Sequence, residues 1–155
     1  MKKGVKVAVF MGSKSDSEVM ESCTIELERF GIDYEVKVSS AHRNPDGTRK
    51  LVEEAVESGV RVFIAGAGMS AALPGFIASL TVLPVIGVPI ASGLPGGLDS
   101  VFSMVQMPPG IPVATVSVGK AGARNAAILA AEILSINNDS IKARLNDMRS
   151  KWREG

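Results

Sequence analysis

A regular alternation of short apolar runs with longer amphipathic stretches is the feature that most constrains the fold of this sequence. Five runs have the length and composition of strands, at residues 5–11, 32–38, 60–65, 85–88 and 113–118. The stretches that follow them carry apolar residues every three to four positions, as one face of a helix does, at residues 19–30, 51–56, 72–80, 98–106 and 123–134. A charged stretch after a break at residues 137–139 predicts an extra C-terminal helix ending near Trp152.

This order predicts an α/β fold with a five-stranded parallel sheet and helices on both of its faces. The length of 155 residues suits a single domain, over residues 1–155, and 46% hydrophobic residues are enough for a packed core. In such a sheet, ligands bind at the carboxyl ends of the strands, where the strand order reverses. We therefore expect the chemistry in the loops that follow the first three strands.

The composition excludes several classes of partner. A net charge of +1 without a basic run, together with 5% aromatic residues, argues against nucleic acid. No run of about 18 apolar residues could cross a bilayer, and Met1, Lys2 and Lys3 lead directly into the first strand rather than into an apolar signal segment. The single cysteine, Cys23, excludes an internal disulfide and fits the reducing cytoplasm, and one cysteine with one histidine excludes a His/Cys metal site within the chain.

The first loop, residues 12–16, lies between a buried strand and the start of a helix. Backbone N–H groups there attract an anion, Gly12 permits close approach, Ser13 and Ser15 add hydroxyl groups, and Asp16 could accept a hydrogen bond from a ribose hydroxyl. The alternative is a simple helix cap, in which Ser15 and Glu18 form a capping box. The loop matches neither the nucleoside-triphosphate nor the dinucleotide glycine motif, so neither ATP nor NAD is indicated.

The second loop, residues 39–46, contains the only histidine of the chain, His42, next to Arg43. An imidazole can act as acid or base at neutral pH, and a guanidinium group can hold a phosphate or carboxylate through two hydrogen bonds. The alternative is a surface turn in which Pro45 precedes a capping Asp46.

The sequence leaves the roles of two further segments open and indicates a structural role for Cys23. The small residues of the third loop, 66–75, allow either close approach to a ligand or close helix–sheet packing. Residues 106–112 could be a stiff connection or a pocket wall given to a neighbouring subunit. Cys23 lies on a core-facing stripe, and no G-x-S-x-G motif is present, so covalent nucleophile schemes are disfavoured.

Four motifs occur in order, at residues 11–16, 40–43, 65–75 and 105–114. They read M-G-S-K-S-D, S-A-H-R, A-G-A-G followed by L-P-G, and V-Q-M-P-P-G-I-P-V-A. Together they closely resemble the N5-carboxyaminoimidazole ribonucleotide mutases of purine biosynthesis, also called the catalytic subunit of phosphoribosylaminoimidazole carboxylase. The resemblance extends from about Val5 to Trp152.

The resemblance implies a flavodoxin-like three-layer α/β/α sandwich, a cytoplasmic homo-octamer, and no metal or organic cofactor. It also implies that a carboxyl group moves from the exocyclic nitrogen of the ribonucleotide to ring carbon C4, through carbon dioxide trapped in the pocket. His42 matches the acid/base histidine, and Ser13, Asp16 and Arg43 match positions around the ribose and phosphate. The other substrate-binding residues expected in these loops are Gly12, Ser40, Ala41, Gly66, Ala67, Gly68, Ser70 and Leu73.

One position departs from the usual mutase pattern. The family commonly reads G-G-A-A-H-L-P-G at the third loop, and Ala72 stands here in place of its second histidine. A branch that carboxylates aminoimidazole ribonucleotide directly also lacks this histidine, so direct carboxylation is the alternative activity. Arg43 and residues 105–107 favour the mutase. A pyridine-nucleotide carboxylase and a nucleotide-binding regulator without catalysis are further alternatives.

Overall fold

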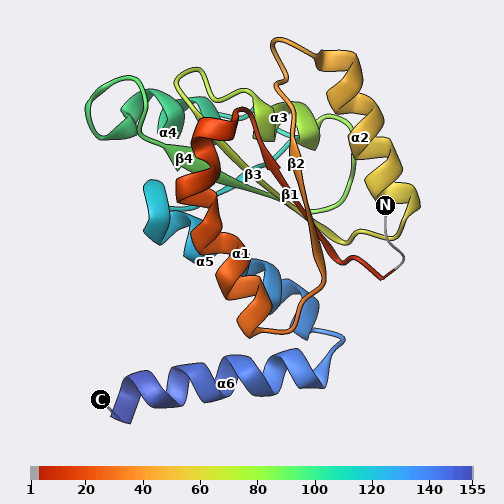
Figure 1. Ribbon diagram of the computed structural model, residues 1–155, viewed down its shortest axis with the longest axis vertical. Coiled ribbons are helices and arrows are strands. Elements are labelled where there is room, and N and C mark those ends of the chain that lie inside the picture. The colour runs from red at the N-terminus through yellow and green to blue at the C-terminus, as the bar shows by residue number, and fades with distance from the viewer. Residues whose placement is uncertain (1–3, 155) are drawn as a thin grey trace.

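A five-stranded parallel sheet forms the centre of the protein (Figure 1), shown by a computed structural model that describes residues 4–154. The strands are β1 (Val7–Met11), β2 (Tyr34–Val38), β3 (Val62–Gly68), β4 (Val85–Ile90) and β5 (Ala114–Thr115). Their spatial order is β2-β1-β3-β4-β5, so the order reverses between β1 and β3. This confirms the predicted flavodoxin-like α/β fold and places the crevice at the ends of β1 and β3. The expectation for Met1 to Lys3 lies outside the described residues.

The described residues form six α-helices, five of which cover the sheet and complete three layers. They are α1 (Ser17–Arg29), α2 (Pro45–Glu57), α3 (Leu73–Ala78), α4 (Leu98–Val105), α5 (Gly119–Ser135) and α6 (Asp139–Glu154), with two short 3-10 turns, η1 (Lys14–Asp16) and η2 (Pro95–Gly97). Helices α1 and α5 pack on one face, and α2, α3 and α4 pack on the other. No helix within residues 4–154 combines the length and the apolar character that a membrane span requires.

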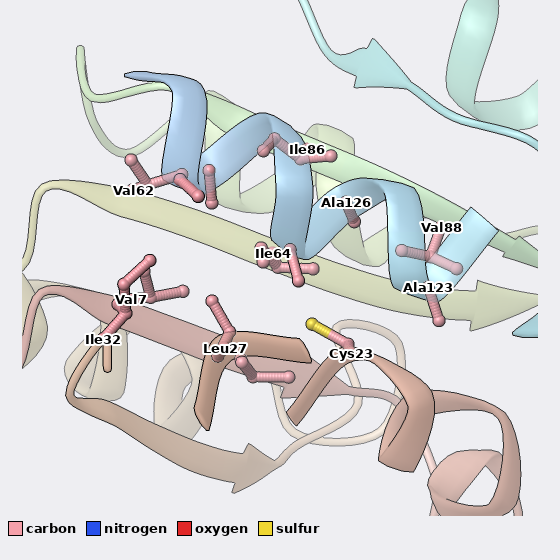
Figure 2. Packing of buried hydrophobic residues seen from close by; sticks show 14 of the residues in the cluster. Val7, Cys23, Leu27, Ile32, Val62, Ile64, Ile86, Val88, Ala123 and Ala126 are labelled. Atoms are coloured by element: carbon pink, nitrogen blue, oxygen red, sulfur yellow. The ribbon is translucent and has the colours of Figure 1, made fainter. Parts of the chain in front are cut away.

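Side chains of β1 point alternately to the two faces of the sheet and pack into the core cluster on each face. Val7 and Val9 belong to the cluster under α1 and α5, whereas Ala8 and Phe10 belong to the cluster under α2, α3 and α4. Figure 2 shows the first cluster, in which Cys23 projects from α1 toward the sheet. Burial raises the pKa of the Cys23 thiol to about 12. The thiol therefore stays protonated and serves as a core residue, as the sequence predicts.

The two edge strands differ from the sequence prediction. The fifth strand was expected over residues 113–118, but β5 pairs with β4 at Ala114 and Thr115 only. In β2, the apolar side chains of Val36 and Val38 are the exposed ones, while Glu35 and Lys37 form a half-buried ion pair of 2.6 Å on the other face. An edge strand lacks a neighbour on one side, so alternation alone does not decide which of its faces is covered.

Helix α6 confirms the predicted extra C-terminal helix. Ile141 and Leu145 bury its inner side in the core shared by α1 and α5, and Arg149 forms an ion pair with Glu132 of α5. In Figure 1 the helix lies beyond the C-terminal end of α1, away from the loops that follow the strands. Helix α6 therefore takes no part in the crevice.

We predict that Ile64→Ala lowers the free energy of unfolding by about 2–5 kcal/mol, because it opens a cavity in the central strand β3. The matched control is Ile136→Ala at the end of α5, where the side chain is 78% exposed, and it should change stability by less than about 0.5 kcal/mol. Urea unfolding followed by circular dichroism measures both values. Equal effects of the two substitutions would contradict the assigned core.

Candidate active site

The first loop is built around a capping box, but not the predicted one. Asp16 Oδ2 accepts a hydrogen bond from Ser13 N at 3.1 Å, and Ser13 Oγ accepts from Ser15 N at 3.3 Å and from Ser15 Oγ at 2.9 Å. The predicted pairing of Ser15 with Glu18 is wrong, because Glu18 instead forms an ion pair with Lys120. The capping interaction therefore begins two residues earlier, at η1, and draws the Asp16 carboxylate into the loop.

Asp16 is a buried carboxylate at the floor of this loop. Desolvation by burial raises the pKa of its carboxyl group, and hydrogen bonds from the backbone of Ser13 and Gly12 partly oppose that shift. A side chain added at Gly12 would meet only Asp16 Oδ2, at 3.9 Å. The loop thus leaves open space above a carboxylate, where a ligand hydroxyl could donate a hydrogen bond.

The second loop is anchored at its base and free at its tip. Ser39 N donates to Met11 O at 3.0 Å, and the buried hydroxyls of Ser39 and Thr48 are hydrogen-bonded at 2.7 Å. Asn44, rather than the expected Asp46, caps α2, because Asn44 Oδ1 accepts from Gly47 N at 3.1 Å. The turn at residues 40–43 projects from this base.

Arg43 joins the second loop to the first. Its Nη2 donates to the Gly12 carbonyl at 3.2 Å, across 31 positions of sequence. His42, next to it, is exposed, and its imidazole has no hydrogen-bond partner within the part of the chain that the structure describes. An unpaired imidazole and a guanidinium group therefore lie together at the opening of the first loop.

The third loop carries local backbone strain. Met69 and Ala71 have φ values of 54° and 23°, in the left-handed region that residues with side chains rarely adopt. Strained backbone of this kind costs on the order of 1–3 kcal/mol per residue and is concentrated at functional sites. The conformation turns the backbone after β3 along the crevice and holds Ala71 N against Gly68 O at 3.0 Å.

These loops enclose one cavity of about 500 Å³, within the usual size range of small-molecule sites. It brings together His42 and nearly all of the predicted binding residues: Gly12, Ser13, Asp16, Ser40, Ala41, Arg43, Ala67, Gly68, Ser70 and Leu73. Gly66 does not line it. A side chain at Gly66 would collide with Met20 Sδ at 2.4 Å, so this glycine serves close packing of α1 on the sheet.

Ser15, whose hydroxyl was expected to contribute to the first loop, also lines the cavity. Four further lining residues were not among the predicted site residues: Met69, Ala71, Ala72 and Ser92. Three of these lie in the third loop, which the sequence had already selected. Ser92 follows β4, a strand whose loop received no functional interpretation. The general rule that ligands bind at the carboxyl ends of parallel strands would have pointed to it, because β4 is the direct neighbour of β3.

The segment at residues 106–112 does not line this cavity. It packs on α3 of its own chain, where Met107 Sδ lies 3.1 Å from the position of a side chain built on Gly75. Within residues 4–154, no three His, Cys, Asp or Glu side chains are grouped so that they could hold a metal ion.

A turn suited to phosphate, a buried carboxylate and an imidazole share one cavity at the switch point of a parallel sheet. These features define an α/β protein of the flavodoxin-like class with a candidate small-molecule site at the switch point of its sheet. The AIR carboxylase family model matches residues 6–155. The chain belongs to the AIR carboxylase family.

Known relatives are similar along almost the whole chain. The N5-carboxyaminoimidazole ribonucleotide mutase of Pyrococcus abyssi is 54% identical over 148 residues, which are 96% of this chain and 84% of that protein. The protein of the same name from Saccharolobus solfataricus is 55% identical over 149 residues, 94% of this chain and 93% of that protein. The crystal structure of Treponema denticola PurE has a TM-score of 0.84 at 30% identity and covers 96% of this chain and 92% of that chain.

We predict that Asp16→Asn stabilises the fold at neutral pH while it weakens ligand binding. The folded-state pKa of Asp16 is raised above its ordinary value of 3.8, so the ionised carboxylate costs stability once the pH exceeds that value. The stability difference between variant and parent should be absent below about pH 4 and should grow as the pH rises. Thermal unfolding from pH 4 to 8 measures it, with the exposed Asp46→Asn as the control. A variant less stable than the parent at pH 7 would contradict the burial of this carboxylate.

Proposed function

We propose that the protein converts N5-carboxyaminoimidazole ribonucleotide to 4-carboxy-5-aminoimidazole ribonucleotide, an isomerisation in de novo purine biosynthesis. The observation that carries the proposal is the shared cavity of His42 and the Ser13 turn, in a chain about half identical to proteins of that name. The proposal takes residues 1–155 as one mutase domain.

The cavity offers a separate group for each part of a ribonucleotide. We assign the phosphate to the hydroxyls of Ser13 and Ser15 and to the guanidinium group of Arg43, because all three donate hydrogen bonds to anions. The Arg43 guanidinium keeps further N–H groups besides the one bound to Gly12 O. Asp16 is assigned to the ribose, since an acceptor-only carboxylate suits hydroxyl groups and repels phosphate.

His42 is assigned the proton transfers. Protonated His42 supplies a proton to the exocyclic nitrogen as the nitrogen–carbon bond breaks and carbon dioxide leaves. Ring carbon C4 then attacks the carbon dioxide and forms the new carbon–carbon bond. Neutral His42 removes the proton from C4, which restores the aromatic ring and returns the imidazole to its starting form. Atoms, electrons and protons balance without a co-reactant, and positioned acid/base groups contribute typically 10²–10⁴-fold to such steps.

Small side chains suit the trapped carbon dioxide. Ala67, Gly68, Ala71 and Ala72 line the cavity beside the strained third loop. A wall of methyl groups and glycine offers the gas no competing nucleophile and little room to drift from C4. Holding the two fragments in this arrangement makes the recombination effectively unimolecular, which lowers its entropic barrier.

We predict that the purified protein turns over N5-carboxyaminoimidazole ribonucleotide and has little activity on aminoimidazole ribonucleotide with bicarbonate. The formation of 4-carboxy-5-aminoimidazole ribonucleotide, followed by its ultraviolet absorbance, measures both reactions. Turnover in the second assay alone would replace the mutase by direct carboxylation, and turnover in neither would remove the enzymatic proposal.

In the same assay, His42→Asn should reduce turnover by at least about 10²-fold, because asparagine cannot exchange a proton. Binding of the product ribonucleotide, measured by calorimetry, should stay within tenfold of the parent. Equal loss of binding and turnover would assign His42 to structure instead.

We infer that the protein assembles as a cytoplasmic homo-octamer. Four large apolar side chains, Leu94, Leu98, Phe102 and Val105, are each more than half exposed along α4 and the loop before it. A stripe of this kind on one helix face is usual at subunit contacts and unusual on a monomer surface. The buried free thiol of Cys23 fits a reducing compartment.

We predict that light scattering at micromolar concentration gives eight times the chain mass of 16.2 kDa. Phe102→Asp should lower that mass, because it puts a charge into the α4 stripe. The control is Val82→Asp, at a fully exposed site between α3 and β4, which should leave the mass unchanged. A monomeric parent would refute the octamer.

A further inference from the structure

We propose that Ser92 is a substrate-binding residue and that Asp99 is the positioning residue that holds it in the cavity. This proposal rests on the mutase function. It adds the loop at residues 91–97, between β4 and α4, to the three substrate-binding loops that follow β1, β2 and β3. Ser92 comes two residues after Ile90, which pairs with Gly68 in the sheet register. Its side chain therefore stands next to the start of the third loop, and it lines the cavity.

The Ser92 hydroxyl is packed onto the backbone of the third loop. A side chain built on Gly68 would lie 1.9 Å from Ser92 Oγ and 3.0 Å from the Ile90 carbonyl, so the serine occupies the space that this glycine leaves. Gly68 thereby admits a hydroxyl group to the cavity wall. A residue with a side chain at position 68 would displace it.

This hydroxyl is unused by the protein itself. Ser13, Ser15 and Ser40 also line the cavity, but each already has a hydrogen-bond partner in the loop that carries it. The Ser70 hydroxyl lines the cavity too and, like that of Ser92, has no hydrogen-bond partner among residues 4–154. Ser92 Oγ has none among residues 4–154, so both its donor and its acceptor capacity remain for a ligand. An oxygen of the ribonucleotide is the matching partner, because phosphate, ribose and carboxylate all present oxygens.

Asp99, in the first turn of α4, holds the loop that carries Ser92. Asp99 Oδ2 accepts from Leu94 N at 3.1 Å, and it lies 2.0 Å from the position of a side chain built on Gly93. The carboxylate is thus pressed against the backbone directly after Ser92. The loop closes through Gly96 and Gly97, whose φ values of 70° and 72° suit glycine, and through Gly97 N donating to Leu94 O at 3.0 Å.

The other oxygen of Asp99 is not held by a second group among residues 4–154. Oδ1 is buried and has no hydrogen-bond partner within the described part of the chain. A desolvated carboxylate oxygen without a partner is unfavourable for stability. Glu35 Oε2 and Thr115 Oγ1 are in the same state, so the positioning role rests on the contact of Asp99 Oδ2 with the loop.

The test measures KM and kcat of the mutase reaction with the full-length protein. Ser92→Ala should raise KM about tenfold and leave kcat within about twofold, as expected when a hydrogen bond to the substrate is made equally in the ground and transition states. Ser150→Ala, an exposed serine on α6, is the matched control and should change neither constant. An unchanged KM for Ser92→Ala, in a parent enzyme that is active, would overturn this proposal and leave the mutase function standing.

The role of Asp99 is tested by comparing the KM values of the two single variants with that of the double variant. Asp99→Ala should raise KM to a similar extent, and the double variant should match Ser92→Ala instead of multiplying the two effects. Asp99→Asn should restore most of the parent KM, because its amide oxygen can still accept from Leu94 N. If Asp99→Ala does not fold, Gly93→Ala displaces the same carboxylate and should raise KM. Multiplied effects in the double variant, or no rise in KM from either disruption, would overturn the positioning role.

Discussion

The burial of both faces of β1, β3 and β4 is the constraint on which the rest of the structure depends. A parallel strand covered on both sides exposes neither face, so functional groups can project only at its ends. Met11, at the end of β1, pairs with Gly66 of β3, which brings the loops after these strands to one edge. The helices are not themselves the site, yet they force the chemistry into the loops that they leave uncovered.

In these loops and in the first turn of α4, several features that are unfavourable for stability occur. Asp16 is a buried carboxylate, Met69 and Ala71 have strained backbone, and Asp99 keeps an oxygen without a partner. Each is tolerated because the surrounding sheet and helices are well packed. Asp16, Met69 and Ala71 line the cavity itself, so much of this cost falls at the site. Among residues 4–154, Glu35 Oε2 and Thr115 Oγ1 are also buried without a partner, and neither residue lines the cavity.

The periodicity of the sequence was enough to predict the strands and helices of the core. In β1, for example, an unbroken apolar run indicates a strand buried on both faces, and its side chains do alternate between two core clusters. The periodicity failed at the edges, where β5 shortens to two residues. It also could not predict Glu26, which lies at the core-facing side of α1 because Arg29 and Arg124 pair with it at 3.1 and 2.9 Å. Contacts across 98 positions of sequence leave no local pattern.

The sequence predicts those residues of the candidate site whose type is itself suited to catalysis or to anion binding. His42 and Arg43 stand out by identity. One hydrogen bond joins Arg43 to Gly12, and His42 lines the same cavity. Ser92 did not stand out, because serine is common and its importance comes from the absence of a side chain at Gly68. The capping roles of Ser13 and Asn44 depend on where each helix begins, and that is the least certain feature of any periodic pattern.

The buried position of Cys23 has a practical consequence for spectroscopy. Because the only thiol of the chain is enclosed between α1 and the sheet and remains protonated, maleimide dyes and spin labels find no target on the native protein. A cysteine introduced on the cavity rim or on α6 would therefore be the single reactive site, without prior removal of the native one. Probes could be attached one per chain to follow loop motion or subunit exchange.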